Sequence, residues 1–220
     1  MPRTERGSRT RAEIVAAAGQ LFVERGYAKA NLADVVERAG VTKGAFYFHF
    51  SSKAQLAHEV VSTYRTWLQD LQTAVAASEP EPLLRPACVL LPVARSFHDS
   101  PITRATTRLL EESNQLDLEP LLKLHVPWWT DVLEQAAERG QLRDGRDRPA
   151  FAWTLNAAFY GTISNSYADC RWQYLPERVL DMLRFVLLPA VTPAAAGLLE
   201  AQLAGLQAEA RVAAGGSSDR

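Results

Sequence analysis

Apolar residues along the chain recur at intervals of three or four, and no segment alternates apolar and polar residues as a half-buried strand would. This spacing places the apolar side chains on one face of a helix, so the chain is expected to be all-α. The segment from Thr10 to Glu13 resembles a capping box that opens the first helix, and Gly26 is expected to end it. We predict about ten helices and no strands.

The next boundaries come from capping residues and glycines. A short second helix is expected to begin after Asn31 and to end at Gly40, and a third runs from Thr42 to about Phe50. A capping box at residues 52–55 opens a long fourth helix that continues to about residue 77. Further helices are expected at about 83–98, 102–113, 119–139, 149–169, 176–188 and 194–211.

Residues 31–50 have the form of a helix-turn-helix, in which a tight turn joins two short helices and the second presents its first residues to the major groove. Gly40 supplies the turn, and the exposed start of the following helix carries Thr42, Lys43 and Gly44. A glycine in an exposed helix costs about 1 kcal/mol of helix stability. A close approach of the backbone to DNA would account for that cost at Gly44.

Charge is unevenly distributed along the chain. Although the formal net charge is only −1, residues 1–57 carry nine Lys and Arg against five acids, whereas the remainder has fifteen basic and twenty acidic residues. A basic first quarter fits a protein that presents one end to a polyanion. No signal peptide or membrane span is expected, and Cys88 and Cys170 are interpreted as reduced thiols of a cytoplasmic protein.

The run G-V-T-K-G-A-F-Y-F-H-F-S-S-K at residues 40–53, with R-G-Y at 25–27, resembles the DNA-binding domain of TetR-type transcriptional repressors. The following Leu-Ala makes it most similar to the γ-butyrolactone-type autoregulator receptors. The resemblance implies a helix-turn-helix domain with a basic arm at 1–57, a larger ligand-binding and dimerisation domain at 58–211, and a flexible tail at 212–220. It also implies double-stranded operator DNA, a small-molecule effector and a second copy of the chain as partners.

The family pattern carries DNA-binding roles to particular positions. Thr42 and Lys43 would reach phosphate and base edges, Gly44 would allow the close approach, and Tyr47 would contact the backbone and a thymine methyl group. Further phosphate or minor-groove contacts are expected from Asn31, His49, Lys53, Arg9 and Arg11. Other readings remain open, since the arginine arm can be a solvated tail and Tyr47 a core residue, while Phe48 and Phe50 are expected in the core.

The helices at 149–169 and 176–188 carry apolar residues on two faces. We predict that one face packs within its own domain and that the other packs against a second copy of the chain. The proposed two-fold interface contains Phe151, Leu155, Ile163, Val179, Leu183 and Val186. Aromatic residues with a few polar ones suit a pocket for a small amphiphile. The candidate pocket residues are Phe97, Gln115, Trp128, Trp129, Asn156, Phe159 and Tyr160, with Trp153 and Asn165 as further candidates.

One position departs from the γ-butyrolactone receptors. His125 stands where those receptors usually carry a tryptophan, about four turns before Gly-Gln-Leu, and Trp128 and Trp129 follow it. The effector can therefore differ from a γ-butyrolactone. The alternatives are a repressor of efflux or catabolic genes that responds to a xenobiotic or antibiotic, and a constitutive repressor without an effector.

An enzyme is disfavoured by the pattern of reactive residues. His98, Asp99 and Ser100 are hydrolase residue types, but neighbours at a helix end do not face one another as a catalytic triad must. The four histidines show no paired spacing typical of metal ligands. We therefore expect no catalytic residue, no metal and no cofactor.

Overall fold

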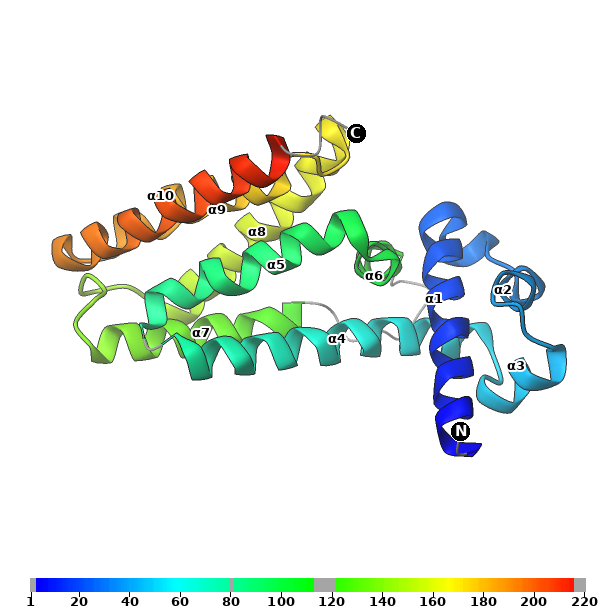
Figure 1. Ribbon diagram of the computed structural model, residues 1–220. Helices are drawn as coiled ribbons and strands as arrows, with labels where there is room; N and C mark the ends of the chain where they lie inside the picture. The colour runs from blue at the N-terminus through cyan, green and yellow to red at the C-terminus, as the bar shows by residue number, and fades with distance from the viewer. Residues whose placement is uncertain (1–2, 80, 113–121, 216–220) are drawn as a thin grey trace. The chain divides into compact units, whose positions relative to one another are not determined.

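The computed structural model describes residues 3–79, 81–112 and 122–215, and over these ranges the protein is helical (Figure 1). The α-helices are α1 (Arg3–Lys29), α2 (Leu32–Arg38), α3 (Lys43–His49), α4 (Lys53–Ser78), α5 (Arg85–Asp99), α6 (Pro101–Glu111), α7 (Leu122–Glu138), α8 (Arg148–Cys170), α9 (Leu175–Val186) and α10 (Pro193–Gly215). Short 3-10 helices η1 (Pro82–Leu84) and η3 (Leu188–Ala190) lie between them. The all-α prediction is confirmed.

The first helix differs from the prediction at both ends. It begins at Arg3 rather than at Thr10, so the expected capping box lies inside a helix that is already under way. Gly26 does interrupt the helix, with φ 73° and ψ 170°, and a final helical turn continues to Lys29. The amino-terminal arm is therefore helical from Arg3 onward.

The chain divides into two compact units. The first unit contains residues 1–69 and 99–121, and the second contains residues 70–98 and 122–220. Helix α6 belongs to the first unit because it packs against α1. The two helices are so close that a Cβ at Gly19 would lie 3.0 Å from Cδ1 of Ile102. The boundary between a DNA-binding and a ligand-binding domain at residues 57 and 58 stays a prediction. The first compact unit extends beyond it and also includes α6.

The core of the first unit holds α1 to α4 and α6 together. Ile14 and Phe22 of α1, Phe46 of α3 and Leu56 of α4 are all fully buried in it. Leu109 brings α6 into the same core. Burying an aliphatic or aromatic side chain of this size stabilises the fold by about 1.5–3 kcal/mol, so the short helices α2 and α3 depend on this core for their positions.

In the second unit, α7 packs on α8, α8 on α9 and α9 on α10. Trp129, Leu133, Phe159, Val179 and Leu183 are among its fully buried side chains. Within the stretches that the structure describes, none of the helices combines the length and the apolar character needed to cross a membrane.

Candidate nucleic-acid interface and effector region

Side-chain caps fix the starts of α2 and α3. Asn31 Oδ1 accepts a hydrogen bond from the backbone N–H of Ala33 at 3.0 Å, and Thr42 Oγ1 accepts one from Ala45 at 3.1 Å. Gly40 adopts φ 64° in the turn between the helices, a conformation that glycine reaches at little cost. The Asn31 amide nitrogen and the Thr42 hydroxyl hydrogen remain available to an external acceptor.

Helix α3 has one buried face and one exposed face. Phe46 at 0% and Phe50 at 1% exposure anchor it in the core. Lys43, Gly44, Tyr47 and Phe48 form the exposed face, with Tyr47 at 55% and Phe48 at 83%. We call these four residues the α3 face. Lys43 and Tyr47 are one turn apart, as are Gly44 and Phe48, so the four side chains share one side of the helix.

The expectation that Phe48 belongs to the core is wrong, while the same expectation for Phe50 is confirmed. Phe46 and Phe50 are four residues apart and point inward together, which turns Phe48 to the opposite side. The helical period of the sequence was enough to predict that Phe48 faces away from Phe46 and Phe50. Phe48 meets the ring of the half-buried His49 edge-on, with ring centroids 5.0 Å apart.

No atom from outside its own helical turn approaches Gly44 closely. A Cβ built there would have only Thr42 Oγ1 within 4 Å, at 4.0 Å. Packing within the protein therefore does not require glycine at this position. This is compatible with a requirement set by an external molecule that approaches α3.

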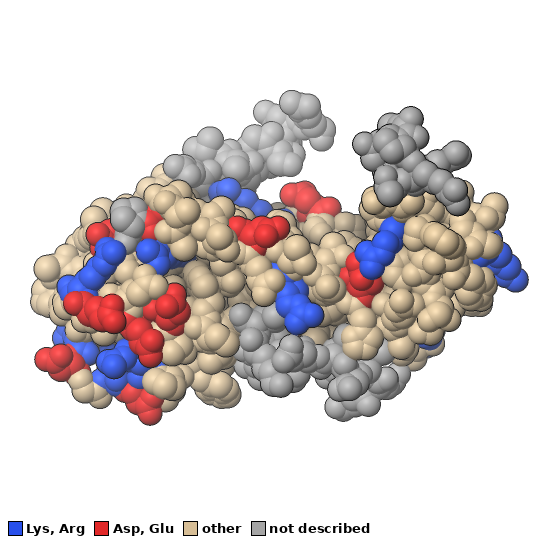
Figure 2. Space-filling view, turned by 90° about the horizontal axis from the view of Figure 1, so that it is seen from below, with Lys and Arg blue, Asp and Glu red and all other residues tan. Residues whose placement is uncertain are grey.

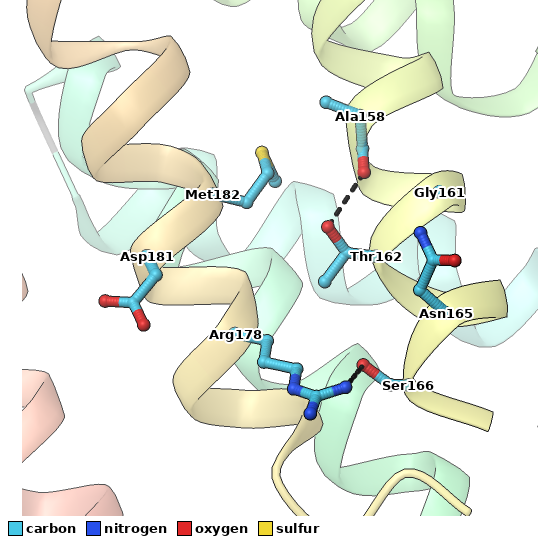
Figure 3. A pocket seen from close by; sticks show the side chains of 8 residues that line it. All are labelled: Ala158, Gly161, Thr162, Asn165, Ser166, Arg178, Asp181 and Met182. Carbon is cyan, nitrogen blue, oxygen red and sulfur yellow. Dashed lines mark hydrogen bonds between the residues drawn. The ribbon is translucent and has the colours of Figure 1, made fainter. Parts of the chain in front are cut away.

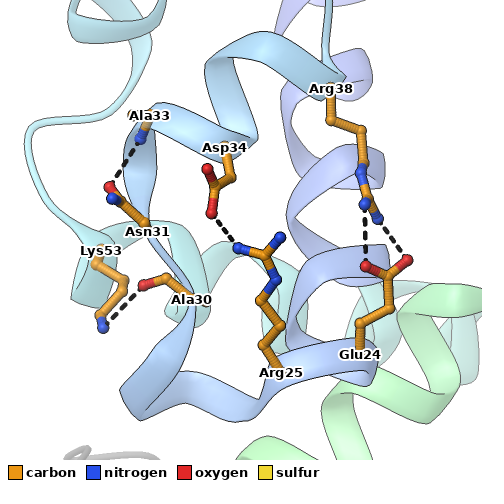
Figure 4. A network of polar contacts seen from close by, with 8 residues as sticks. All are labelled: Glu24, Arg25, Ala30, Asn31, Ala33, Asp34, Arg38 and Lys53. Atoms are coloured by element: carbon orange, nitrogen blue, oxygen red, sulfur yellow. Dashed lines mark hydrogen bonds and ion pairs between the residues drawn. The ribbon is translucent and has the colours of Figure 1, made fainter.

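Several arginines of the first unit are paired with acidic residues of the same unit. Figure 4 shows Arg38 bound by two hydrogen bonds of 2.6 and 2.9 Å to Glu24, and Arg25 paired with Asp34. The hydrogen bonds from Arg38 hold the pKa of Glu24 below its usual value. These pairs tie α2 to α1 and leave fewer of the basic side chains of this unit without an acidic partner.

Arg9 and Arg11, predicted to contact DNA from a basic arm, lie in α1 and have acidic partners. Arg9 Nε is 3.0 Å from Glu13 Oε1, and Arg11 pairs with Glu59 of α4 while its guanidinium lies over the Phe50 ring. Neither residue belongs to an extended arm. The described lysines of the first unit, Lys29, Lys43 and Lys53, have no ion-pair partner, and of these Lys43 is on the α3 face.

On one face of the molecule, charge is mixed rather than concentrated (Figure 2). On the face drawn in Figure 2, basic and acidic side chains lie beside one another. In the second unit, Arg139 and Glu81 form an ion pair at 3.3 Å. Position on α3, rather than bulk charge, therefore distinguishes Lys43.

The structure gives Lys53 a role within the fold. Its Nζ donates to the backbone carbonyls of Tyr27, Ala28 and Ala30 at 2.8, 3.1 and 3.1 Å, and it lies 4.5 Å from the Tyr27 ring centroid. Figure 4 shows it reaching the segment between α1 and α2. An ammonium group has three hydrogens, and three carbonyls use them all. The expected phosphate contact would require Lys53 to leave these partners.

We expect Lys53→Met to lower the free energy of unfolding by about 1–2 kcal/mol, because three carbonyls lose a charged donor while the side-chain stem is kept. Urea denaturation followed by circular dichroism measures this change. If Lys53 contacted phosphate instead, the variant would release about one counterion fewer on binding DNA. The slope of log affinity against log salt concentration would then be shallower by about one, while the free energy of unfolding stayed the same. That second result would contradict the structural role.

In the second unit, five predicted pocket residues lie on α7 and α8, which pack against each other. Trp129, Asn156 and Phe159 are almost completely buried, and Tyr160 is half-buried. The ring of His125, which is also fully buried, lies 6.0 Å from that of Phe159 and 5.9 Å from that of Tyr160. Sequence reasoning noted His125 only as a departure from the family and did not include it in the site.

The other candidates are more scattered. Phe97 packs against Trp172, near the carboxyl end of α8, with ring centroids 5.0 Å apart. Trp128 is half-buried beside Trp129, and Trp153 and Asn165 are exposed. Gln115 lies outside the described residues.

Four of the six predicted interface residues are buried within their own chain. Leu155, Ile163, Val179 and Leu183 have exposures between 0% and 3%, so their side chains are not available to a second chain. They pack in the core of the second unit because α8 and α9 lie against each other. Phe151 and Val186 are half-buried.

The surface between α8 and α9 forms an open groove of about 410 Å³. Small and polar residues line it, as Figure 3 shows: Ala158, Gly161, Thr162, Asn165, Ser166, Arg178, Asp181 and Met182. Arg178 donates to Ser166 at 3.4 Å and pairs with Asp169, which joins the two helices at one end of the groove. Farther along α9, Phe185 is 76% exposed.

Comparisons with known proteins agree with this description. The family model described as "Bacterial regulatory proteins, tetR family" matches residues 14–60. The chain is 32% identical over 214 residues to the probable HTH-type transcriptional regulator ArpR of Pseudomonas putida, which covers 85% of this chain and 96% of that protein.

Two solved structures share the fold. A γ-butyrolactone receptor described as ArpA-like has a TM-score of 0.79 at 28% identity, covering 93% of this chain and 99% of that chain. CprB of Streptomyces coelicolor, solved in complex with its operator, has a TM-score of 0.78 at 26% identity, covering 90% and 98%. This chain therefore belongs to the TetR family of DNA-binding transcriptional regulators, a non-enzymatic family.

Proposed function

We propose that the protein is a homodimeric cytoplasmic repressor that binds a palindromic operator through α3 and is released by a small molecule. The observation that carries the DNA-binding part is the α3 face, where an unpaired lysine and two aromatic side chains project from a helix fixed by the core. The likeness to CprB, solved with its operator, supports the same placement of α3 in a major groove.

The residues divide into two groups by what they would contact. Lys43 and Tyr47 would meet base edges from the α3 face, and Phe48 adds an apolar surface suited to a thymine methyl group. Asn31, Thr42 and His49 would contact phosphates, since the first two keep a donor beyond their capping bonds.

We expect Lys43→Ala to weaken operator binding about 5- to 150-fold, because a base-reading contact is worth about 1–3 kcal/mol. A duplex selected from a random library serves as the operator, and fluorescence anisotropy measures its affinity. The loss should be larger for the operator than for a scrambled duplex, whereas His49→Ala should weaken both by the same factor.

Arg95→Ala is the matched control for Lys43→Ala, because it removes one exposed positive charge from α5 in the second unit. Its affinity for the operator should stay close to that of the unmodified protein. Unchanged operator binding by both Lys43→Ala and Tyr47→Ala would refute the assignment of the α3 face.

The dimer is proposed to form through α8 and α9. A two-fold interface uses the same surface twice, so a protruding side chain needs a recess on that surface. The groove beside Gly161 and Ala158 supplies the recess, and the exposed Phe185 supplies the protruding apolar group. These residues replace Leu155, Ile163, Val179 and Leu183 as the candidates for contact with the second copy.

We expect Phe185→Asp to weaken dimerisation about a hundredfold or more, because two apolar anchors are lost and two charges would enter the interface. Size-exclusion chromatography with light scattering reports the mass at a series of concentrations. Leu198→Asp, which changes a half-exposed leucine on α10, is the control and should leave the dimer intact. A stable dimer in the Phe185 variant would place the interface elsewhere.

Release requires the effector to favour a state that does not fit the operator. The two recognition helices of a dimer must lie about 34–36 Å apart to enter successive major grooves. Helix α4 begins in the first unit and ends in the second, so a tilt of α4 would change this spacing. The effector shifts the balance only by its difference in affinity for the two states.

The effector is proposed to be γ-butyrolactone-like, on the likeness to the ArpA-like receptor. The test adds lactones and antibiotics separately to the protein–operator complex and follows anisotropy. Release by a lactone supports the proposal. Release by an antibiotic alone would instead indicate a xenobiotic-responsive repressor, and no release by any compound would indicate a constitutive one.

A further inference from the structure

Three polar side chains in the second unit are completely buried and have no hydrogen-bond partner within the described part of the chain. They are His125 and Trp129 of α7 and Asn156 of α8, each at 0% exposure. Both imidazole nitrogens, the indole nitrogen and both atoms of the amide are unpartnered. Native proteins pair the large majority of such groups, because burying an unpaired polar group is costly.

The three residues lie at one helix interface. His125 and Trp129 are one turn apart on α7, and Asn156, Phe159 and Tyr160 share one side of α8. The His125 ring is about 6 Å from the rings of Phe159 and Tyr160, and α7 packs along α8. The unpartnered groups therefore belong to one region with an aromatic wall.

Among the described residues, no charged group contributes to the pKa shift of His125. Burial alone lowers the pKa of His125 to about 4, without a contribution from any neighbouring charge, so the ring is neutral near pH 7. Tyr160 is the titratable group whose ring faces it from α8. An ionised ligand would lose its hydration here and would find no opposite charge among the side chains that the structure describes.

The donor and acceptor groups in the region are unequal in number. A neutral imidazole offers one N–H and one acceptor nitrogen, an indole one N–H, and a primary amide two N–H groups and one carbonyl. Together the three side chains thus offer four donor hydrogens and two acceptor atoms to a ligand. A complementary molecule has mostly acceptor oxygens, as a lactone, ester or ketone does, with at most a hydroxyl group as donor.

We infer that the effector is an uncharged, oxygen-rich amphiphile whose polar head binds His125, Trp129 and Asn156. This inference rests on the proposed function and narrows it. It adds His125 to the site and excludes carboxylates and amines as effectors. The aromatic rings of Phe159 and Tyr160 would contact the apolar part of the same molecule.

The probes are γ-dodecalactone and its ring-opened form, 4-hydroxydodecanoate, which share a carbon skeleton but differ in charge. Isothermal titration calorimetry on the full-length protein at pH 7 should show that the lactone binds about tenfold or more tightly than the hydroxy acid. His125→Phe and Asn156→Leu should each weaken lactone binding about tenfold, because an acceptor oxygen loses its donor.

A second measurement separates ligand binding from a structural role. The melting temperature of the unliganded His125→Phe and Asn156→Leu proteins should be unchanged or higher, since each variant removes an unpaired buried polar group. Thr130→Val on α7 is the control, because that hydroxyl already donates to the carbonyl of Val126 in its own helix. Its lactone affinity should not change.

Several results would overturn the inference: tighter binding of the hydroxy acid, no binding of the lactone, lactone affinity in both variants equal to that of the unmodified protein, or a lower melting temperature in both. The proposed repressor function fails on a different result. It fails if the protein binds no duplex specifically, or if the lactone binds as expected and leaves the operator complex intact.

Discussion

Replacing Gly26 with alanine is expected to lower the free energy of unfolding by about 3 kcal/mol, through backbone strain and lost hydrogen bonds. Gly26 has φ 73° and ψ 170°, a region that glycine alone occupies readily. This residue breaks α1 and allows the last helical turn to lead into α2. An alanine must either adopt the strained conformation or move that turn.

The surroundings of Gly26 add to the cost. A Cβ at this position would lie 2.5 Å from Glu112 Oε1 and 2.9 Å from an Arg108 nitrogen. Glu112 accepts a hydrogen bond of 2.7 Å from the backbone N–H of Tyr27, and Arg108 donates one of 2.5 Å to the carbonyl of Val23. Both side chains can move aside, but only by loosening the contacts that hold α1 beside the end of α6.

Gly40→Ala is the matched control. Gly40 also has a positive φ, of 64°, but a Cβ there would meet no atom within 4 Å. We expect a loss of about 1–2 kcal/mol from the left-handed conformation alone. Urea denaturation of both variants measures the difference. Equal losses at the two positions would show that the contacts of Glu112 and Arg108 contribute nothing at Gly26.

The helices and the turn of the DNA-binding unit were predictable because their signals are local. Asn31 and Thr42 each cap the helix that follows within three residues, so a short stretch of sequence contains the whole interaction. The same kind of pattern failed at Thr10. A Thr with Glu three residues later also occurs inside helices, and nothing before Thr10 ends the preceding turns.

Burial was harder to predict where a helix is apolar on two sides. In α8 the sequence shows two apolar stripes and does not say which one the chain covers itself. The structure buries Leu155 and Ile163 and leaves Trp153 57% exposed. Only the packing of α7 and α9 against α8 decides between the stripes, and that packing depends on residues distant in sequence.

Long-range contacts account for the other differences. Lys53 bonds to carbonyls that lie 23 to 26 residues earlier, so no local pattern distinguishes it from a lysine free to bind phosphate. The burial of His125 likewise depends on Phe159 and Tyr160 of another helix. Its type and position were visible in the sequence, but its lack of partners was not.

Acid is expected to destabilise the protein through His125. Burial lowers its folded-state pKa to about 4, against 6.5 for an exposed histidine, so the unfolded chain binds the proton more tightly. The free energy of unfolding is therefore unaffected by this histidine above pH 6.5, and it decreases as the pH drops toward 4. At about 1.4 kcal/mol per pKa unit, this one side chain accounts for a loss of about 3 kcal/mol.

Urea denaturation at pH values from 7.5 to 4 isolates this contribution when three proteins are compared. The unmodified protein and His58→Gln, which lacks an exposed histidine of α4, should lose stability along the same curve. His125→Phe should follow a flatter curve between pH 6.5 and 4, because it has no buried imidazole to protonate on unfolding. Parallel curves for all three proteins would mean that the His125 ring reaches solvent or a carboxylate in the folded protein. The proposal that His125 binds an uncharged ligand would then be contradicted.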